Sequence, residues 1–281
     1  MPELPEVETI RRGLEATLPG TEITGLTLFR PEVVAFPDPE EFSGFFPGKV
    51  WGRAGRRGKY LLLEVADRVL VVSLRMTGQL VLLPGPAEAS PGVPADLPPH
   101  THVLWHLSDG TRLRFTDQRR FGRLYLVGPE RLEELTPAGK LGPEPLAPEF
   151  TPARLAEILA RHRRPVKALL LDQSLVAGIG NIYADEILFA AGISPLRPAA
   201  EVEPEAAARL HQAAREILTA AIASRGTTVR NYQDGHGQAG GFQERLAVYG
   251  RAGEPCRRCG QPVAYLRLGG RGTCYCPRCQ V

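Results

Sequence analysis

The first residues of the chain, Met1-Pro2-Glu3, could place a nucleophile beside a proton donor. Removal of the initiator Met1 is usual before a small residue and leaves Pro2 with a free secondary amine. An α-amino group titrates near ~7.7–8.0, far below a lysine at ~10.4, so much of it is uncharged at neutral pH. Its attack on a sugar aldehyde carbon gives a cationic iminium, and Glu3 could supply a proton. The simpler alternative is that both residues only favour the first turn of a helix.

Cysteines near the C-terminus form two CxxC pairs, Cys256 with Cys259 and Cys276 with Cys279. This spacing is typical of a zinc site. Four thiolates complete a tetrahedral shell, so we expect one structural zinc ion. The alternatives are two disulfides or a redox pair; a cytoplasmic location argues against disulfides, and a second CxxC argues against a single redox site. We interpret the fifth cysteine, Cys274, as a spare that faces away.

Basic residues gather in separate clusters, although the net charge is only +3. The clusters lie at 53–59, 112–123, 161–167 and 251–281, and the last contains six Arg and one Glu. Any one of them could be ordinary solvated surface. Four together suit a long polyanion, so we expect a nucleic acid partner.

Lysine occurs only four times, and we expect the arginines near Lys59 to favour its neutral form.

Two short motifs could contact such a partner. Gly178–Tyr183 places glycines and Asn181 before a predicted helix, where backbone N–H groups can meet a phosphate; a plain turn between helices explains the motif equally well. The run 117–122 sets two arginines beside Phe121, and Met76 also stands next to a turn. Apolar side chains with arginine can replace a base that has left the stack. The alternative is that Met76 and Phe121 belong to the core.

The first half of the chain is predicted to be mainly β-structure after one helix. Residues 5–18 have helical apolar spacing and end at Pro19-Gly20. Short strands with tight turns follow from about 22 to 128, which predicts a β-sandwich. The Pro-rich stretch 84–99 is expected to be a mobile loop. The predicted strands are Tyr60–Val65, Val69–Met76, Gly78–Leu83, His102–Leu107, Thr111–Phe115 and Gly122–Val127.

The second half is predicted to be helical, after a linker at Thr136–Pro148 that is rich in Pro and Gly. Thr151 and Pro152 begin a first helix. Residues 227–245 are polar and Gly-rich, which predicts a loop, and a β-type tail carries the cysteines. The further predicted helices are Pro165–Leu171, Asn181–Ala191 and Pro204–Ser224.

No stretch approaches the ~18 consecutive apolar residues of a membrane helix, and the first residues do not resemble a signal peptide. We therefore expect a cytoplasmic protein without a membrane partner.

Several longer stretches are similar to those of one known family. They are MPELPEVET at the start, GKYLLLE at 58–64, RMTGQL at 75–80, TDQRRFG at 116–122, LGPEPL at 141–146, GIGNIYADEILF at 178–189, RGTT at 225–228, VYGRAGEPC at 248–256 and the terminal CPRCQ. Together they resemble the bacterial formamidopyrimidine-DNA glycosylases, base-excision repair enzymes for oxidised purines. PELPE in place of PEGPE, and Met76 in RMTG, favour this family over the related endonuclease VIII, which acts on oxidised pyrimidines.

The resemblance implies an α+β fold of two domains with a zinc finger. Residues 1–135 would form a catalytic β-sandwich flanked by helices, and 136–150 a linker. Residues 151–250 would form a helix–two-turn–helix DNA-binding domain. Residues 251–281 would form a four-cysteine β-hairpin zinc finger.

The resemblance also implies roles for single residues. Pro2 would attack the anomeric carbon, expel the base and form a Schiff base, and Glu3 would protonate the opening sugar. Lys59 would act as an acid in β-elimination, and Arg271 would hold phosphate and assist δ-elimination. Residues 227–243 would cover the extruded base. The implied DNA contacts are Met76, His100, Arg119, Arg120, Phe121, Arg163, Lys167 and Asn181, of which Met76, Arg119 and Phe121 would fill the gap left by the flipped nucleotide. Position 163 is often Lys in the family, and the 227–243 loop is unusually rich in Gly.

We therefore expect a bifunctional DNA glycosylase and AP lyase that binds damaged double-stranded DNA. It would act as a monomer without a protein partner, in the bacterial cytoplasm at the nucleoid. Two alternatives remain open, an endonuclease VIII-like specificity and a non-catalytic zinc-finger DNA-binding protein.

Overall fold

The computed structural model describes residues 2–85, 97–229 and 231–281. These form two compact units, here called unit 1 (residues 1–140 and 225–241) and unit 2 (residues 141–224 and 242–281). The loop expected at 84–99 lies mostly outside the described residues. Residues 225–241 fall within the range expected for the DNA-binding domain, yet their contacts belong to unit 1 because they pack on its first helix and on one of its strands.

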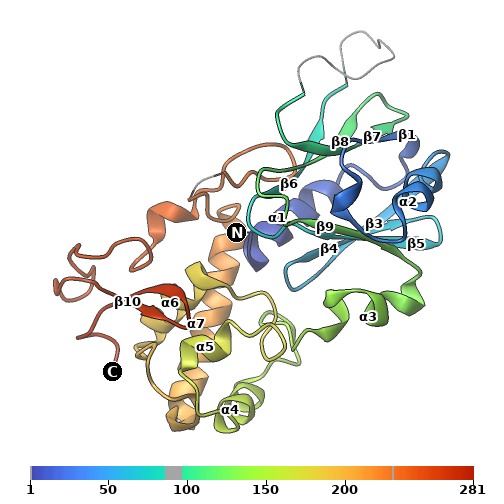
Figure 1. The fold of residues 1–281 in the computed structure, drawn as a ribbon. Coiled ribbons are helices and arrows are strands. Elements are labelled where there is room, and N and C mark those ends of the chain that lie inside the picture. The colour runs from blue at the N-terminus through green and yellow to red at the C-terminus, as the bar shows by residue number, and fades with distance from the viewer. Residues whose placement is uncertain (1, 86–96, 230) are drawn as a thin grey trace. The chain divides into compact units, whose positions relative to one another are not determined.

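Unit 1 combines a large sheet with short helices (Figure 1). Its helices are α1 (Leu4–Glu15), α2 (Pro39–Phe45) and α3 (Leu132–Leu135), with 3-10 turns at Pro31–Val33, Pro129–Arg131 and Pro137–Lys140. Its strands are β1 (Glu22–Leu28), β2 (Val34–Phe36), β3 (Lys49–Arg57), β4 (Tyr60–Val65), β5 (Arg68–Ser73), β6 (Gly78–Leu83), β7 (Thr101–Leu107), β8 (Arg112–Asp117) and β9 (Arg123–Val127).

The strands follow the order β2-β9-β5-β4-β3-β1-β7-β8-β6. Only two residue pairs join β1 to β3, so the sheet divides there into two halves. The halves face each other across one core, in which Trp51 of β3 lies 6.3 Å from Trp105 of β7. Val7, Ile10 and Leu14 of α1 are buried in the same core. The predicted β-sandwich flanked by helices is thereby confirmed.

Two predicted elements run three residues past the observed ends. The helix predicted over 5–18 ends at Glu15, and Leu18 is buried in the turn that follows. The strand predicted over 69–76 ends at Ser73, because the chain turns sharply and the Gly78 N–H bonds the Leu74 carbonyl at 2.9 Å. This turn makes Met76 a loop residue.

Unit 2 is helical and ends in a hairpin. Its helices are α4 (Pro152–Ala160), α5 (Val166–Leu170), α6 (Asn181–Ala191) and α7 (Pro204–Ala223), with 3-10 turns at Ala199–Glu201 and Phe242–Arg245. The strands β10 (Ala264–Leu268) and β11 (Arg271–Tyr275) form the hairpin. None of the helices that the structure describes has both the length and the apolar character needed to cross a membrane.

Gln173 closes the two turns between α5 and α6. Its side-chain oxygen accepts the Gly178 N–H at 2.9 Å, and its amide donates to the carbonyls of Leu171 and Ile179. Gly178 has a left-handed backbone (φ +86°), which glycine adopts without steric cost. These contacts set Asn181 at the first position of α6.

Candidate active site

Pro2 and Glu3 are both buried at the start of α1. Glu3 occupies the N-cap position, and its backbone N–H donates to the Glu6 carboxylate at 2.8 Å. Such a bond from the third helical residue back to the cap stabilises the helix start. The position of Pro2 is therefore fixed by the folded helix that follows it.

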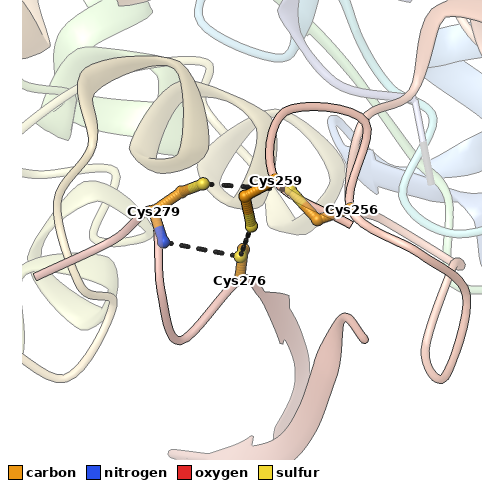
Figure 2. A group of neighbouring side chains, drawn as sticks. All are labelled: Cys256, Cys259, Cys276 and Cys279. Atoms are coloured by element: carbon orange, nitrogen blue, oxygen red, sulfur yellow. Dashed lines mark hydrogen bonds between the residues drawn. The ribbon is translucent and has the colours of Figure 1, made fainter. Parts of the chain in front are cut away.

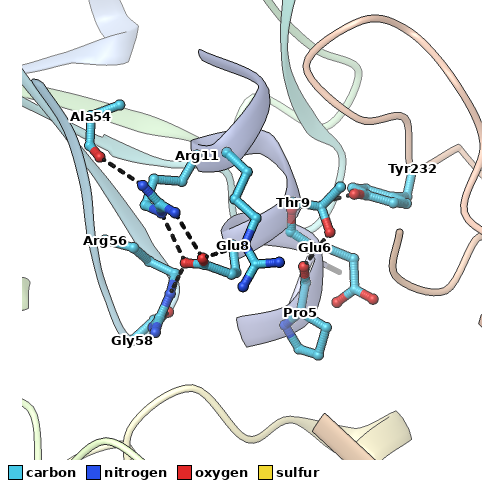
Figure 3. A network of polar contacts seen from close by, with 10 residues as sticks. Pro5, Glu6, Glu8, Thr9, Arg11, Ala54, Arg56, Gly58 and Tyr232 are labelled. Atoms are coloured by element: carbon cyan, nitrogen blue, oxygen red, sulfur yellow. Dashed lines mark hydrogen bonds and ion pairs between the residues drawn. The ribbon is translucent and has the colours of Figure 1, made fainter. Parts of the chain in front are cut away.

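The same Glu6 carboxylate holds the segment 225–241, here called the recognition loop. It accepts the Thr227 N–H at 2.7 Å. The Tyr232 hydroxyl donates to the Glu6 carbonyl at 3.3 Å (Figure 3). Burial and the nearby Glu6 charge raise the pKa of Tyr232, so its hydroxyl stays a neutral donor. A Cβ at Gly226 would lie 2.9 Å from the Glu6 carboxylate, so the close approach requires glycine.

Further contacts fix the far side of the recognition loop. The Asp234 carboxylate accepts the N–H groups of His236 and Gln238, each at 2.9 Å. The Leu82 N–H of β6 donates to the Gly235 carbonyl at 2.8 Å. The loop therefore has a defined conformation within unit 1, on both sides of residue 230, which the structure does not describe.

Lys59 lies in the tight turn between β3 and β4, after Gly58 with φ +56°. Arg56 donates to the Gly58 carbonyl at 2.9 Å and pairs with Glu8 of α1 at 3.2 Å (Figure 3). Burial alone would raise the pKa of Glu8, but hydrogen bonds from Arg11 and other arginines lower it overall. This network connects the turn of Lys59 to the helix that begins at Pro2. A neutral Lys59 amine stays a prediction.

The expected DNA contacts of unit 1 lie at the surface. Met76 is 37% and Phe121 49% exposed, so the alternative that they belong to the core is wrong. The guanidinium of Arg119 lies 4.7 Å from the centre of the Phe121 ring. His100 and Arg120 are exposed as well. Apolar side chains held at a surface beside arginine are suited to insertion between bases.

In unit 2, Arg271 is exposed at the tip of the β10–β11 hairpin, after two glycines with positive φ. The next carbonyl, that of Gly272, accepts hydrogen bonds from Asn181 at 2.9 Å and from Lys167 at 3.0 Å. A cavity of about 260 Å³ lies beside the tip and is lined by Arg164 and Arg271 among others. The structure thus places the Asn181 amide against the residue that follows Arg271, and a joint grip of these two residues on phosphate stays a prediction.

Lys167, one of the expected DNA contacts, is a buried residue. Its side chain is 1% exposed and pairs with the buried Asp185 at 2.6 Å. It also donates to Thr273 at 2.8 Å, while Asp185 accepts the Cys274 N–H at 2.9 Å. Burial raises the pKa of Asp185 to about 6, although Lys167 opposes this. The pair holds β11 in place, and Lys167 also lines the cavity beside Arg271, so its role as a DNA contact stays a prediction. Arg163, in contrast, is exposed.

The four predicted zinc ligands form one cluster (Figure 2). Their sulfur atoms all lie within 4.8 Å of one another, with 3.5 Å between Cys259 and Cys276 and 3.9 Å between Cys256 and Cys279. A tetrahedral zinc with bonds of ~2.3 Å separates its sulfurs by about 3.8 Å, so the cluster fits a structural zinc ion.

All five cysteines are free thiols, so the disulfide alternative is wrong. Without a cation, burial and the neighbouring thiols raise the pKa of Cys279 to about 12, and a bound dication removes this obstacle to ionisation. Cys274 is buried, as a spare would be, and is not part of the four-sulfur group. Glu186 of α6 accepts the N–H groups of residues 247–249 and so anchors the start of the finger.

Comparison with known proteins identifies the family. Sequence models match for the formamidopyrimidine-DNA glycosylase N-terminal domain at residues 1–124, for its H2TH domain at 141–233 and for the zinc finger found in FPG and IleRS at 253–281. The chain belongs to the formamidopyrimidine-DNA glycosylase family. A formamidopyrimidine-DNA glycosylase of Moorella thermoacetica is 54% identical over 95% of both chains.

Solved structures agree with this assignment. The Lactococcus lactis FPG mutant G226P, in complex with Fapy-dG-containing DNA, matches with a TM-score of 0.90 and 35% identity over 99% of both chains. The wild-type Lactococcus lactis FPG in complex with DNA containing an oxidised pyrimidine matches with 0.89 and 35% over 99% of both. The protein accordingly carries the N-terminal, H2TH and zinc-finger regions of a formamidopyrimidine-DNA glycosylase, and its four clustered cysteines fit one structural zinc ion.

Sequence reasoning missed four acidic residues that organise the site. Glu6, Glu8, Asp117 and Asp185 are buried or half-buried and each accepts bonds near a predicted functional residue. All four lie inside the quoted motifs, but their residue types alone do not separate an organising carboxylate from a solvated one. The usable signal was an acidic residue inside an otherwise apolar helix face, as at Glu6 and Asp185.

Proposed function

We propose that the protein excises oxidised purines, such as 8-oxoguanine and formamidopyrimidines, and then cleaves the strand through a Schiff base on Pro2. The observation that carries the proposal is the Glu6 carboxylate, which binds the Glu3 N–H and the Thr227 N–H together. It joins the nucleophile segment to the recognition loop, which by family resemblance covers the extruded base. A base and its sugar can then meet both parts at once.

The chemistry assigns one role to each catalytic residue. The Pro2 nitrogen attacks C1′ and the bond to the base breaks, with the electron pair leaving on the base. The proton of the attacking amine passes to the departing base. Glu3 protonates the sugar ring oxygen as the ring opens, and the freed nitrogen lone pair forms the iminium. Lys59 and Arg271 then assist β- and δ-elimination of the flanking phosphates. Covalent catalysis divides one difficult displacement into easier steps.

The DNA contacts follow from exposure and charge. Met76, Arg119 and Phe121 are proposed to fill the gap left by the flipped nucleotide. His100, Arg120 and Arg163 are proposed phosphate contacts, and Asn181 and Arg271 the grip on the phosphates beside the lesion. Lys167 is proposed to position that grip from inside the protein. The zinc finger keeps the Arg271 hairpin folded.

The proposed domains are 1–135 for catalysis, 151–250 for DNA binding and 251–281 for the zinc finger, with 136–150 as the linker. The recognition loop belongs to the second range by sequence and supplies contacts to the first. We further propose that the enzyme works as a monomer in the bacterial cytoplasm at the nucleoid.

Oxidised pyrimidines are a second candidate substrate class, because the Lactococcus lactis FPG has been solved with DNA of that kind. Strand cleavage of matched duplexes with 8-oxoguanine or thymine glycol separates the two classes. We expect faster cleavage at 8-oxoguanine, and the reverse order would favour an endonuclease VIII-like specificity.

Glu3→Gln tests whether the protein is catalytic at all. The variant keeps the shape of the side chain but removes its acidic proton donor. We expect it to bind damaged duplex DNA normally and to excise the base at least about a hundredfold more slowly. Unchanged excision would remove Glu3 from the chemistry, and binding without turnover in the wild type would favour the non-catalytic alternative.

A further inference from the structure

The carboxylate of Asp117, the last residue of β8, is fully buried. One of its oxygens accepts the hydroxyl of Thr77 and the N–H of Arg119, the latter at 3.2 Å. The other oxygen accepts the Gly122 N–H at 2.7 Å. The Arg119 N–H also reaches the Thr77 oxygen at 3.0 Å. One buried side chain therefore connects two turns that are far apart in the sequence, since Thr77 and Asp117 are 40 positions apart.

The backbone of Asp117 holds a further loop. Its N–H donates to the His100 carbonyl at 3.1 Å, and its carbonyl bonds the ring of His102 at 2.8 Å and the N–H of Arg120 at 3.3 Å. The predicted DNA contacts of unit 1 thus divide into two groups. The side chain of Asp117 holds the turns that carry Met76, Arg119 and Phe121, and its backbone binds His100 and Arg120.

The turns around Asp117 have unfavourable backbone conformations. Arg75, His100 and Arg120 have φ of +51°, +68° and +58°, and they are three of the five non-glycine residues with positive φ in the described ranges. L-residues rarely adopt this conformation, and it persists only where surrounding contacts hold it. Strain concentrated on three loops that all bond Asp117, through its side chain or its backbone, indicates that their shape serves a purpose other than stability.

Two glycines let the turns approach this closely. A Cβ at Gly78 would lie 2.4 Å from the Leu74 carbonyl oxygen. A Cβ at Gly122 would lie 2.7 Å from the Phe115 ring and 3.1 Å from the Asp117 carboxylate. Neither glycine can be replaced by a larger residue unless its turn moves. The two glycines therefore help to define the geometry of both turns.

We propose that Asp117 is the positioning residue of the DNA-opening wedge, here defined as Met76, Arg119 and Phe121. Its carboxylate fixes the two turns so that the three side chains enter the duplex as one preorganised group. Preorganisation lowers the entropy lost on binding, which leaves more of the contact energy to offset base unstacking. The inference rests on the proposed function, since it assumes that the wedge replaces a flipped nucleotide.

Asp117→Asn tests this selectively. Both carboxylate oxygens accept backbone N–H groups, from Arg119 and from Gly122. The amide has one such oxygen, so its NH₂ group must face one of those N–H donors. The backbone contacts to His100 and Arg120 stay, and the size of the side chain is preserved. Thr77→Val removes the Thr77 hydroxyl with its bond to the Asp117 carboxylate and its bond from the Arg119 N–H, and Thr77→Ser keeps both as a matched control.

The experiment compares two duplexes under single-turnover conditions, one with 8-oxoguanine opposite cytosine and one with an abasic site opposite cytosine. Only the first requires a base pair to be broken. We expect Asp117→Asn to slow cleavage of the first by about tenfold or more and of the second by no more than about threefold. Phe121→Ala should give the same pattern, Thr77→Val a weaker one and Thr77→Ser none.

An equal loss on both duplexes, or no loss on either, would overturn the inference. If Phe121→Ala cleaves both duplexes at the wild-type rate, the wedge does not open DNA and the inference fails as well. Fluorescence of 2-aminopurine beside the lesion measures duplex opening without catalysis. If the wild type cleaves neither duplex, the proposed function fails. The inference about Asp117 then depends on the fluorescence measurement, in which Asp117→Asn must open the duplex less than the wild type does. Equal opening of the duplex by both proteins would contradict the inference.

Discussion

The Glu6 carboxylate accepts a hydrogen bond of 2.7 Å from the backbone N–H of Thr227, although 221 positions separate the two residues. It also accepts the Glu3 N–H at 2.8 Å. One buried side chain therefore connects the segment of Pro2 to the recognition loop at 225–241. The recognition loop and the nucleophile segment therefore share one anchor.

Glu6→Gln should uncouple the recognition loop from α1. The amide cannot accept both N–H groups, and a lost bond to a charged acceptor costs about 1.5–3 kcal/mol. We expect faster amide hydrogen exchange in 225–241 and about tenfold slower excision of 8-oxoguanine, with duplex binding nearly unchanged. Glu40→Gln, at an exposed position of α2, is the control and should change neither. Unaltered exchange in the loop would show that Glu6 does not anchor it.

Glu8→Gln should loosen the turn of Lys59. The substitution removes the ion pair to Arg56, whose guanidinium also binds the Gly58 carbonyl. We expect strand cleavage after base loss to slow more than base excision, because Lys59 is proposed to act in elimination. The measurement is the rate of each step on one 8-oxoguanine duplex. Equal effects on both steps would contradict a link to Lys59.

The same substitution predicts a pH dependence. Because the folded-state pKa of Glu8 lies below its ordinary 4.5, its stabilising effect is present above that pH and is lost as the pH falls through the lowered value. We expect about 1.5–3 kcal/mol at neutral pH, absent in Glu8→Gln. Trp51 and Trp105 both lie in the core of unit 1, so tryptophan fluorescence during urea unfolding reports this unit. A constant difference between the variants from pH 3 to 7 would argue against the ion pair.

Lys167 and Arg163 should respond differently to salt. Removal of one exposed phosphate contact lowers the slope of log K against log[salt] by about 0.9, which we expect for Arg163→Ala. Lys167→Met leaves Asp185 buried without its partner and should cost about 3–5 kcal/mol of stability. The double variant Lys167→Met/Asp185→Leu should regain stability and keep the wild-type slope. A smaller slope of log K against log[salt] in the double variant than in the wild type would show that Lys167 contacts DNA.

Zinc removal should act on the finger alone. Chelation, or Cys276→Ser, should unfold the β10–β11 hairpin and weaken DNA binding, because the ligands fold only around the metal. The fluorescence of the two tryptophans of unit 1 should not change. Cys274→Ser is the matched control and should retain one zinc ion per chain. DNA affinity that survives complete metal removal would contradict the role of the finger.

Local patterns predicted the parts of the fold that depend on local chemistry. The zinc cluster followed from two CxxC pairs, since thiolates at that spacing have few other uses. α1 and most strands followed from apolar periodicity. The end of β5 was missed because the tight turn from Leu74 to Gly78 interrupts an apolar run that the pattern alone continues.

Contacts between distant segments could not be predicted. Nothing in the sequence pairs Glu6 with Thr227 or Thr77 with Asp117. A lysine in a basic cluster looks solvated, and only the folded unit shows that Lys167 is buried against Asp185. Likewise, an apolar residue beside a turn fits a core or a surface, and the exposure of Phe121 decided between them.

Borohydride trapping tests the central claim most directly. The enzyme is incubated with a duplex carrying 8-oxoguanine opposite cytosine, reduced, digested and analysed by mass spectrometry, with Pro2→Gly as the comparison. We predict a covalent adduct on Pro2, free of Met1, and a Pro2→Gly variant that binds the duplex but loses excision and lyase activity. An adduct on Lys59 or another amine, or a fully active Pro2→Gly, would contradict Pro2 as the nucleophile.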